Sequence, residues 1–423
     1  MKRLWIVLAA ASLYAQQPMH LTLAEAQHLA IQNNPAFSAS RYEAAAAHQV
    51  PLEYRANYAP TLGGTFTSVG ADNGTRLGAG ALNNPVVYSR LGSGLTVNQL
   101  VTDFGRTSNL VGMARLRAQA QDQVTEATRA DILLATSQAY FQVLKTQSLL
   151  KVAAQTVAAR QTVADQVSAL AQNNLKSTLD VSFAEVNLSE AKLLEVQSQN
   201  DVQSAEAVLA ADMGIPSPPA GFVLRDEPMP AELPGDVAPL IVQAIDQRPE
   251  LRDLRLEASA AQRFARAEHD LFFPTLGVIG TAGLVPTNAD SIPPRYGAIG
   301  LNVTIPIFNG GLFRARQTEA EMHARAAELN VGDLANRVMR DVRVAWLNAM
   351  TARQRITIAQ QLEDQARLAL DLAQSRYDLG LSSIVELSQA QLNLTSAQIG
   401  NTSARYDYQA ARAAVEYQIG SLR

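Results

Sequence analysis

Histidine often serves as a metal ligand or a general base, and the chain carries five: His20, His28, His48, His269 and His323. Their positions show no metal-ligand spacing, and the chain has no cysteine. Neither a Ser-His-Asp set nor a glycine-rich loop that could hold a phosphate stands out. The sequence therefore predicts a protein that is not an enzyme and that requires no metal and no cofactor.

Two carboxylates remain as candidates for a chemical role because they stand at matching places. Asp180 and Glu386 are 206 residues apart, and each lies just past a short turn between two runs of helix-forming residues. A carboxylate at such a place can attract cations. It can equally be an N-cap or first-turn acid that complements the dipole of its helix, and the two roles are compatible.

These places match because the chain contains an internal repeat. Residues 95–213 correspond to residues 301–419 without a gap, so that Tyr140 corresponds to Trp346. Upstream the offset becomes 214, where residues 60–63 correspond to residues 274–277. An internal repeat has to be recognised before local structure is assigned, because both copies are expected to fold alike. We therefore expect a first repeat over 16–214, a proline-rich equatorial linker over 215–239 and a second repeat over 240–423.

The first fifteen residues are typical of a secretory signal. Lys2 and Arg3 precede a short apolar stretch, and cleavage after Ala15 would expose Gln16. This stretch is shorter than the roughly 20 residues of a membrane-spanning helix, and no cysteine follows it for a lipid anchor. The net charge is −4, and no basic stripe with interleaved aromatic residues points to nucleic acid.

Long helices dominate the expected secondary structure. Residues 106–173 contain no proline and only Gly112, which predicts one helix of roughly 100 Å. A turn at Asn173 follows, and Thr178 or Asp180 is expected to cap the next helix. The second copy predicts helices over 312–376 and 384–419. Shorter helices are expected over 22–34, over 36–58 with a kink or boundary at Pro51, and over about 238–273.

Four segments alternate in period two and predict strands: about 60–71, 86–102, 275–285 and 295–307. Four glycine-rich strands have edges that need partners, and in lipid only helices and closed barrels satisfy every backbone group. We expect the hairpins to close into a membrane barrel by oligomerisation. Aromatic residues at the ends of the strands are candidates for an interfacial girdle or for ordinary core packing: Tyr58, Phe104, Phe272, Phe273 and Phe308.

Several short motifs, in this order, resemble the TolC-like outer-membrane efflux proteins (outer membrane factors). They are the Leu-x-Glu-Ala at 23–26, the prolines Pro35 and Pro249, Pro-Thr-Leu before each hairpin, Phe-Asn-Gly-Gly at 308–311, and Leu-Gly at 379–380. The resemblance covers essentially the mature chain. It implies an α+β fold of two repeats, with long antiparallel helical hairpins forming a periplasmic α-barrel. Each protomer would give four strands to a trimeric, twelve-stranded transmembrane β-barrel.

The resemblance also assigns roles to the two turns. Asp180 and Glu386 match acidic positions that line the periplasmic entrance, and Tyr377 matches a tyrosine that helps to hold it shut. The family's lock arginine falls on Ser382 and its second entrance aspartate on Gln389, so two entrance groups are missing. The turn residues are candidates for adaptor docking or simply for helix termination: Leu175, Lys176, Ser177, Leu379, Gly380, Leu381 and Ser382.

By this resemblance the chain is a passive exit duct of a tripartite efflux or type I secretion system in the outer membrane. The implied partners are two further copies of the chain, outer-membrane lipid, a periplasmic adaptor and an inner-membrane pump of the RND, ABC or MFS class. Protein or metal-ion cargo are alternatives, although no methionine or histidine cluster favours metal. A soluble periplasmic helical scaffold or adaptor is the alternative from another class, and membrane fractionation separates the two.

Overall fold

The computed structural model describes residues 19–72, 90–218, 221–285 and 293–422. The expected leader lies outside these residues, as does the beginning of the strand expected at 86–102. The chain divides into two compact units, which are described one at a time. The first comprises Met1–Arg41, Val124–Leu251 and Leu334–Arg423, and the second comprises Tyr42–Gln123 and Arg252–Asp333. Among the described residues, no helix is both long enough and apolar enough to cross a membrane.

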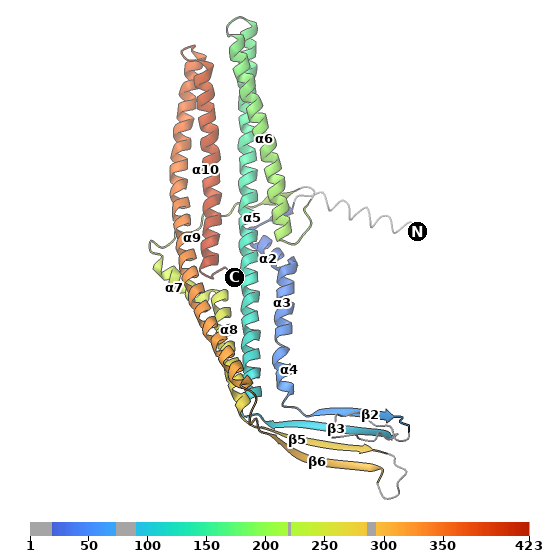
Figure 1. The fold of residues 1–423 in the computed structure, drawn as a ribbon. Helices are drawn as coiled ribbons and strands as arrows, with labels where there is room; N and C mark the ends of the chain where they lie inside the picture. Colours follow the sequence, from blue (N-terminus) through green and yellow to red (C-terminus); the bar gives the residue numbers. More distant parts are fainter. Residues whose placement is uncertain (1–18, 73–89, 219–220, 286–292, 423) are drawn as a thin grey trace, which may run out of the picture. The chain divides into compact units, whose positions relative to one another are not determined.

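Two helical hairpins make up most of the first unit, and the initial parts of their two long helices belong to the second unit (Figure 1). One pairs α5 (Arg106–Gln172) with α6 (Thr178–Asp212), and the other pairs α9 (Leu312–Asp378) with α10 (Ile384–Gln418). The long helices have 67 residues each and the shorter ones 35 each. The four helices that the sequence predicted are confirmed, and the repeat extends to equal lengths in the structure.

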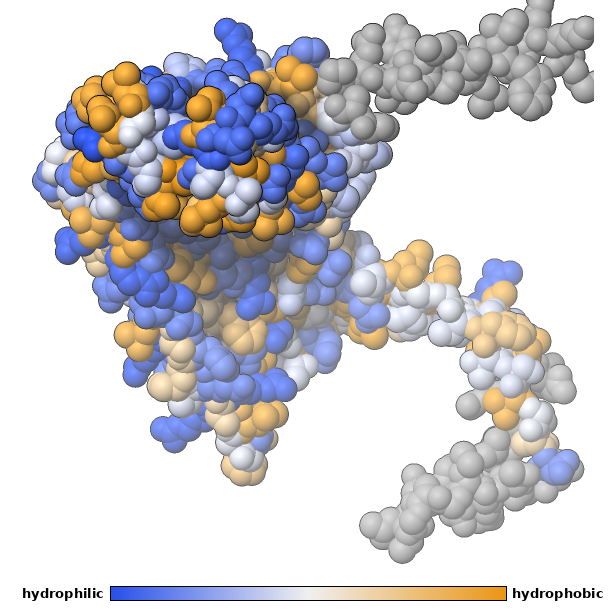
Figure 2. All heavy atoms as spheres, turned by 90° about the horizontal axis from the view of Figure 1, so that it is seen from above, coloured by the Kyte–Doolittle hydropathy of each residue, from blue (hydrophilic) through white to orange (hydrophobic). Residues whose placement is uncertain are grey.

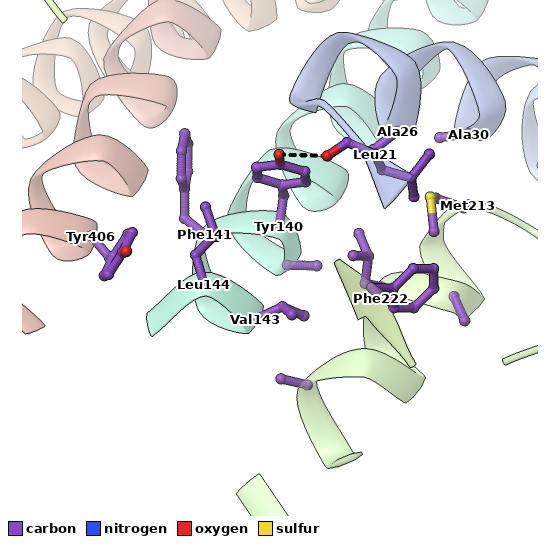
Figure 3. Packing of buried hydrophobic residues seen from close by; sticks show 14 of the residues in the cluster. Leu21, Ala26, Ala30, Tyr140, Phe141, Val143, Leu144, Met213, Phe222 and Tyr406 are labelled. Atoms are coloured by element: carbon purple, nitrogen blue, oxygen red, sulfur yellow. Dashed lines mark hydrogen bonds between the residues drawn. The ribbon is translucent and has the colours of Figure 1, made fainter. Parts of the chain in front are cut away.

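The core of the first unit lies where α5 passes a small parallel sheet of β1 (Met19–Leu21) and β4 (Phe222–Leu224). Tyr140 of α5 is fully buried there, and its single hydroxyl proton is shared between the carbonyl oxygens of Leu21 (3.0 Å, Figure 3) and Arg225 (2.7 Å). Next to β1, α2 (Leu23–Asn33) begins with the expected capping box of Thr22 and Glu25.

Two proline residues divide the shorter helices. Asn34 and Arg248 are both extended, with ψ of 121° and 124°, because a following proline disfavours the helical conformation. The single helix expected over 238–273 is therefore wrong. The chain forms α7 (Ala238–Gln247), α8 (Pro249–His269) and the 3-10 turn η2 (Asp270–Phe272) instead.

A glycine closes each repeat against one of these proline breaks. Gly214 has φ +65°, and a Cβ there would lie 2.8 Å from the carbonyl oxygen of Asn33. Its counterpart Gly420 has φ +71°, and a Cβ there would lie 3.0 Å from the carbonyl carbon of Gln247. Positive φ and close backbone approach both favour glycine, which explains why the two repeats end alike.

The second unit contains a four-stranded antiparallel sheet in the order β2 (Thr61–Val69), β3 (Arg90–Thr102), β5 (Thr275–Leu284) and β6 (Arg295–Thr304). The central β3–β5 pair joins the two repeats, which leaves β2 and β6 as edges. Upstream, α3 (Pro35–Ala47) and α4 (Val50–Ala56) replace the continuous helix expected over 36–58, with Pro51 in the first turn of α4. Pro51 thus marks a helix boundary.

The register gives this sheet one apolar and one polar face, because side chains alternate along each strand. The apolar face carries Leu62, Phe66, Leu91, Leu95, Val97, Leu276, Val278, Leu284, Ile299, Leu301 and Val303. The other face also carries Val69, Leu100, Ile279, Tyr296 and Ala298, but most of its residues are threonine, asparagine or glycine: Thr61, Gly63, Thr65, Thr67, Gly92, Gly94, Thr96, Asn98, Thr275, Gly277, Thr281, Gly283, Gly300, Asn302 and Thr304. Most of the large apolar residues are exposed in the single chain.

Candidate functional site

The two hairpin turns have the same backbone design. Asn174 (φ +59°) follows α5 and Gly380 (φ +71°) follows α9, and both occupy the left-handed conformation that ends helices. The next residue then donates a hydrogen bond five residues back, from Leu175 N to Leu170 O (2.9 Å) and from Leu381 N to Arg376 O (2.8 Å). Both turns therefore have the same backbone conformation, and corresponding side chains of the two copies stand at equivalent places.

A serine begins the helix after each turn. Ser177 is the N-cap of α6, so the expectation that Thr178 or Asp180 caps it is wrong. Asp180 is the third residue of α6, where its carboxylate accepts hydrogen bonds from Ser177 N (3.1 Å) and Ser177 Oγ (2.9 Å). This capping box satisfies helix donors and places a negative charge at the positive end of the helix dipole. Asp180 is therefore the first-turn acid of α6, which is one of the two roles that the sequence left open.

Glu386 stands at the same place in α10 but has a different partner. Its backbone N–H donates to Oγ of the N-cap Ser383 (3.4 Å), while its carboxylate forms an ion pair with Arg376 Nε of α9 (3.2 Å). Both side chains of this pair are about half exposed. Since a guanidinium lies beside it, Glu386 presents less net negative charge than the sequence comparison of the two turns suggested.

Lys176 connects the two hairpins at their turns. Its Nζ lies 3.9 Å from the ring centroid of Tyr377, which is the last but one residue of α9. Tyr377 is buried, and its hydroxyl has no hydrogen-bond partner. Burial raises the pKa of Tyr377, and the negative charges of Asp180 and Asp378 raise it further. The ring and not the hydroxyl therefore makes the polar contact here, as a cation–π interaction.

Sequence reasoning did not detect the pairs Lys176–Tyr377 and Arg376–Glu386. A signal was present in the repeat, where Lys176 corresponds to Ser382 and Arg376 to Leu170. Each of these charged residues has an uncharged counterpart in the other repeat. Such a difference beside a turn is consistent with a contact between the two repeats of one chain. Ser382, where the resemblance places the missing lock arginine, has a buried hydroxyl without a partner.

Behind the turns, the hairpins share an apolar cluster. Val167 of α5, Leu188 of α6 and Leu387 of α10 are buried in it together with Tyr377. Asn187 of α6 donates a 2.7 Å hydrogen bond to Ser388 Oγ of α10, which ties the hairpins on the same side. The turns of one chain therefore form a joint structure, not two independent tips.

The outer surface of the turns is apolar in part. Figure 2 views the molecule from the end that carries the hairpin turns and shows hydrophobic side chains among hydrophilic ones. Four leucines at or beside the turns are more than 60% exposed: Leu175, Leu179, Leu379 and Leu381. Gln389 is exposed as well, and its amide donates to Asn393 of the same helix (3.0 Å).

The predicted girdle residues lie around the junction of strands and helices in the second unit. The rings of Phe104 and Phe273 are 6.0 Å apart, and Phe272 meets Phe313 at 5.9 Å. Tyr58 is exposed after α4, and Phe308 is exposed between β6 and α9. Phe313 belongs to this group but was not predicted. Within the described part of the chain, no group of three or more histidine, aspartate or glutamate side chains could hold a metal ion.

Known proteins with this architecture are outer-membrane channels. The solved structure of the Campylobacter jejuni CmeC outer membrane channel superimposes with a TM-score of 0.80 at 18% sequence identity, covering 94% of this chain and 85% of that one. Outer membrane protein TolC of Salmonella enteritidis is 25% identical over 95% of this chain and 83% of its own length. Alkaline protease secretion protein AprF of Pseudomonas aeruginosa is 24% identical over 100% of this chain and 89% of its own length.

The family model described as outer membrane efflux protein matches residues 26–214 and 240–421. The chain therefore belongs to the outer membrane efflux protein family and is an outer-membrane protein. Its relatives are outer-membrane channels of efflux and secretion systems. The comparisons favour the exit duct over the soluble helical scaffold.

Proposed function

We propose that three copies of this chain form a passive exit duct of a tripartite efflux or type I secretion system. The sheets of three protomers close into a twelve-stranded barrel in the outer membrane, and the helical hairpins surround a periplasmic tunnel. A periplasmic adaptor docks at the turns and connects the duct to an inner-membrane RND, ABC or MFS pump. No chemical step is required of the duct, which provides a passage.

The two-faced sheet with open edges is the observation that carries this proposal. Its exposed apolar face fits contact with lipid, and its threonine-rich and glycine-rich face fits a water-filled interior. The edges β2 and β6 lack partners within the described chain. Since an open edge cannot remain in lipid, pairing β6 of one protomer with β2 of the next satisfies both. The girdle aromatic residues, near the ends of the strands, then lie at the level of the headgroups.

The hairpin turns supply the periplasmic mouth of the proposed duct. Asp180 and Glu386 recur three times around it, and such a ring of carboxylates favours cations. Tyr377 and Lys176 keep the two hairpins of a protomer together and the mouth narrow. The exposed leucines at the turns offer the adaptor an apolar surface, and docking there separates the hairpins.

Extraction of outer membranes with mild detergent, followed by native mass determination, tests the assembly. We expect a particle of three chains, each at most 45.5 kDa, which resists mild denaturation. A control extraction of the soluble periplasm should contain little of the protein. Recovery as a monomer or dimer in the soluble fraction would exclude the duct. The adaptor is then sought by crosslinking from a cysteine placed at Leu381 in the native trimer.

A further inference from the structure

Tyr296 is the only aromatic side chain on the polar face of the sheet, as far as the described strands extend. It lies near the start of β6, at the end of the sheet away from the helices. Residues directly opposite it on the next two strands are glycines: Tyr296 pairs with Gly283 of β5, and Gly283 pairs with Gly94 of β3. A tyrosine therefore stands beside two consecutive positions without side chains.

The tyrosine ring occupies the space above these glycines. A Cβ built on Gly283 would lie 2.5 Å from both Cζ and Oη of Tyr296. A Cβ on Gly94 would collide with the same hydroxyl and lie 3.4 Å from Cζ. The side chain thus lies down across β5 and reaches β3 at the height of a Cβ atom. The two glycines form a seat for it, and Tyr296 is still 43% exposed on the other side.

We propose that Tyr296 determines the width of the exit of the duct, and that Gly94 and Gly283 keep this exit wide by allowing the ring to lie against the wall. The inference rests on the proposed function, in which the polar face lines the interior. Threefold symmetry places three such rings at one level. Lying flat, they take little of the cross-section, whereas raised rings would project inward from three sides and exclude large solutes.

The seat distinguishes this role from simple shielding of a glycine-rich backbone, which aromatic residues also provide. Shielding requires only that the ring covers the strand. Control of width predicts that lifting the ring obstructs passage and that removing the ring restores it. Gly94 is suited to the test because its other neighbour within 4 Å, Ala282 O, is at an ordinary 3.4 Å. At Gly283 a Cβ would also collide with the backbone oxygen of Ser93, so a change there would disturb the strands directly.

The experiment uses the lack of native cysteine. Asn98→Cys places one thiol on the polar face, four residues beyond Gly94 toward the helices, at a depth of about 13 Å. Intact cells are treated with a small, membrane-impermeant maleimide or with a large polyethylene glycol maleimide. The backgrounds are wild type, Gly94→Ala, Gly94→Ala with Tyr296→Ala, and Gly300→Ala. Gly300 is a matched control on the same face, where a Cβ would have only an ordinary 4.0 Å contact.

We expect the small reagent to label all four proteins at similar rates. The large reagent should label the Gly94→Ala protein several-fold more slowly than wild type, and the Tyr296→Ala change should restore the rate. Gly300→Ala should have no effect. If Gly94→Ala fails to reach the membrane, Tyr296→Trp, a bulkier ring over the same seat, replaces it with the same expected slowing.

Two results would overturn the inference. Equal labelling of the wild type and the Gly94→Ala protein by the large reagent would show that the ring does not limit the exit. Slow labelling that persists after Tyr296→Ala would show that the sheet, and not the ring, had changed. Failure of the small reagent to label Asn98→Cys in intact cells is a different result, because it would contradict the proposed polar interior open to the outside.

Discussion

Single side chains at the turns hold the two hairpins together, and Lys176 makes the most specific of these contacts. A partly exposed cation–π interaction contributes about 0.5–1 kcal/mol. We predict that Lys176→Met, which keeps the apolar stem, shifts the mouth toward the separated state and raises the mean conductance of the purified trimer in planar bilayers by a factor of about two to five.

Two control substitutions test this contact. The family resemblance assigns Tyr377 a role in holding the entrance shut, and we attribute that role to its ring. Lys176→Arg keeps a cation over the ring and should leave the conductance unchanged. Tyr377→Phe should also have no effect on closure, because the hydroxyl is buried without a partner and only the ring is used. A marked increase of conductance in Tyr377→Phe would show that the hydroxyl and not the ring is essential.

Glu250 confers a pH dependence on the first unit. Burial raises its pKa, but hydrogen bonds and the charge of Arg248 outweigh burial and lower the pKa below the ordinary 4.5. A carboxyl with a lowered folded pKa contributes stability above its unfolded pKa and loses it as the pH falls through the folded pKa. Melting of the Glu250→Gln trimer should therefore depend less on pH below about 4.5 than melting of wild type. Parallel curves for the two proteins would contradict this.

The N-cap of α6 illustrates what the sequence could and could not supply at this scale. Residue types led us to expect Thr178 or Asp180 as the cap, whereas the structure has Ser177, another cap-forming type, at this position. The capping box of Thr22 and Glu25 was predicted from its Thr-x-x-Glu spacing, whereas the same spacing of Ser177 and Asp180 was overlooked. Contacts between the hairpins, such as Lys176 with Tyr377, depend on how distant segments pack and are not encoded in local spacing.

At the scale of elements, the linker after β4 is fixed at two points by corresponding aromatic residues. Tyr140 donates to the carbonyl oxygen of Arg225, and Trp346, its counterpart in the second repeat, donates from Nε1 to that of Pro234 (3.0 Å). Ion pairs of Asp226 with Arg405 and of Glu232 with Arg353 lie along the same segment. These pairs are exposed and contribute little. Gln409 is buried and donates to the carbonyl oxygen of Glu227 (2.9 Å), so it fixes the path of the linker together with the two aromatic residues.

The two aromatic anchors should differ in strength. Tyr140→Phe removes the hydroxyl donor from the carbonyl oxygen of Arg225, while the carbonyl oxygen of Leu21 still accepts from the N–H of Arg225, and the change should destabilise the protein by about 1–3 kcal/mol. Trp346→Phe removes one hydrogen bond near solvent and should cost less than about 1 kcal/mol. Thermal unfolding followed by circular dichroism compares them, with Tyr42→Phe as an exposed control. Equal losses of stability in the Tyr140→Phe and Trp346→Phe variants would contradict this prediction, which rests on the deeper burial of Tyr140.

Most elements were predictable because their patterns are long or repeated. The four long helices follow from stretches free of proline, and the strand pairs follow from alternation in two corresponding places. The break at Arg248 was missed although Pro249 has a counterpart in Pro35, where a break was recognised. The register of the sheet, which decides which side chains share a face, requires strand pairing between repeats and could not be obtained from either strand alone.

Charge at the mouth belongs to the scale of the whole assembly, because it is summed over three chains. Arg376 and Glu386 are paired within each protomer, so their contributions oppose each other. Glu386→Gln should lower the cation selectivity of the trimer, and Arg376→Gln should raise it, as reversal potentials in a salt gradient would show. Asp180→Asn, which can still accept the capping hydrogen bonds, should act like Glu386→Gln.

High salt provides a control, since screening should reduce all three effects. Reversal potentials that do not respond to any of the three substitutions would show that the turns do not line the conducting path. The family and the channel class could be predicted from motifs spread over the chain. The net charge at the turns could not be predicted from the sequence. It depends on arginine and lysine contacts that only the folded hairpins bring about.

The strand order β2-β3-β5-β6 also determines which mutations of the protein should be dominant. An isolated protomer in the membrane would leave two strands unsatisfied, so insertion and assembly must be a single event that no chain completes alone. A chain with a damaged edge strand would still contribute its sound edge and occupy a place in the ring. In a cell that makes equal amounts of both chains, random assembly leaves only about one trimer in eight fully intact. Defects in β2 or β6 should therefore be dominant, whereas losses of expression should be recessive.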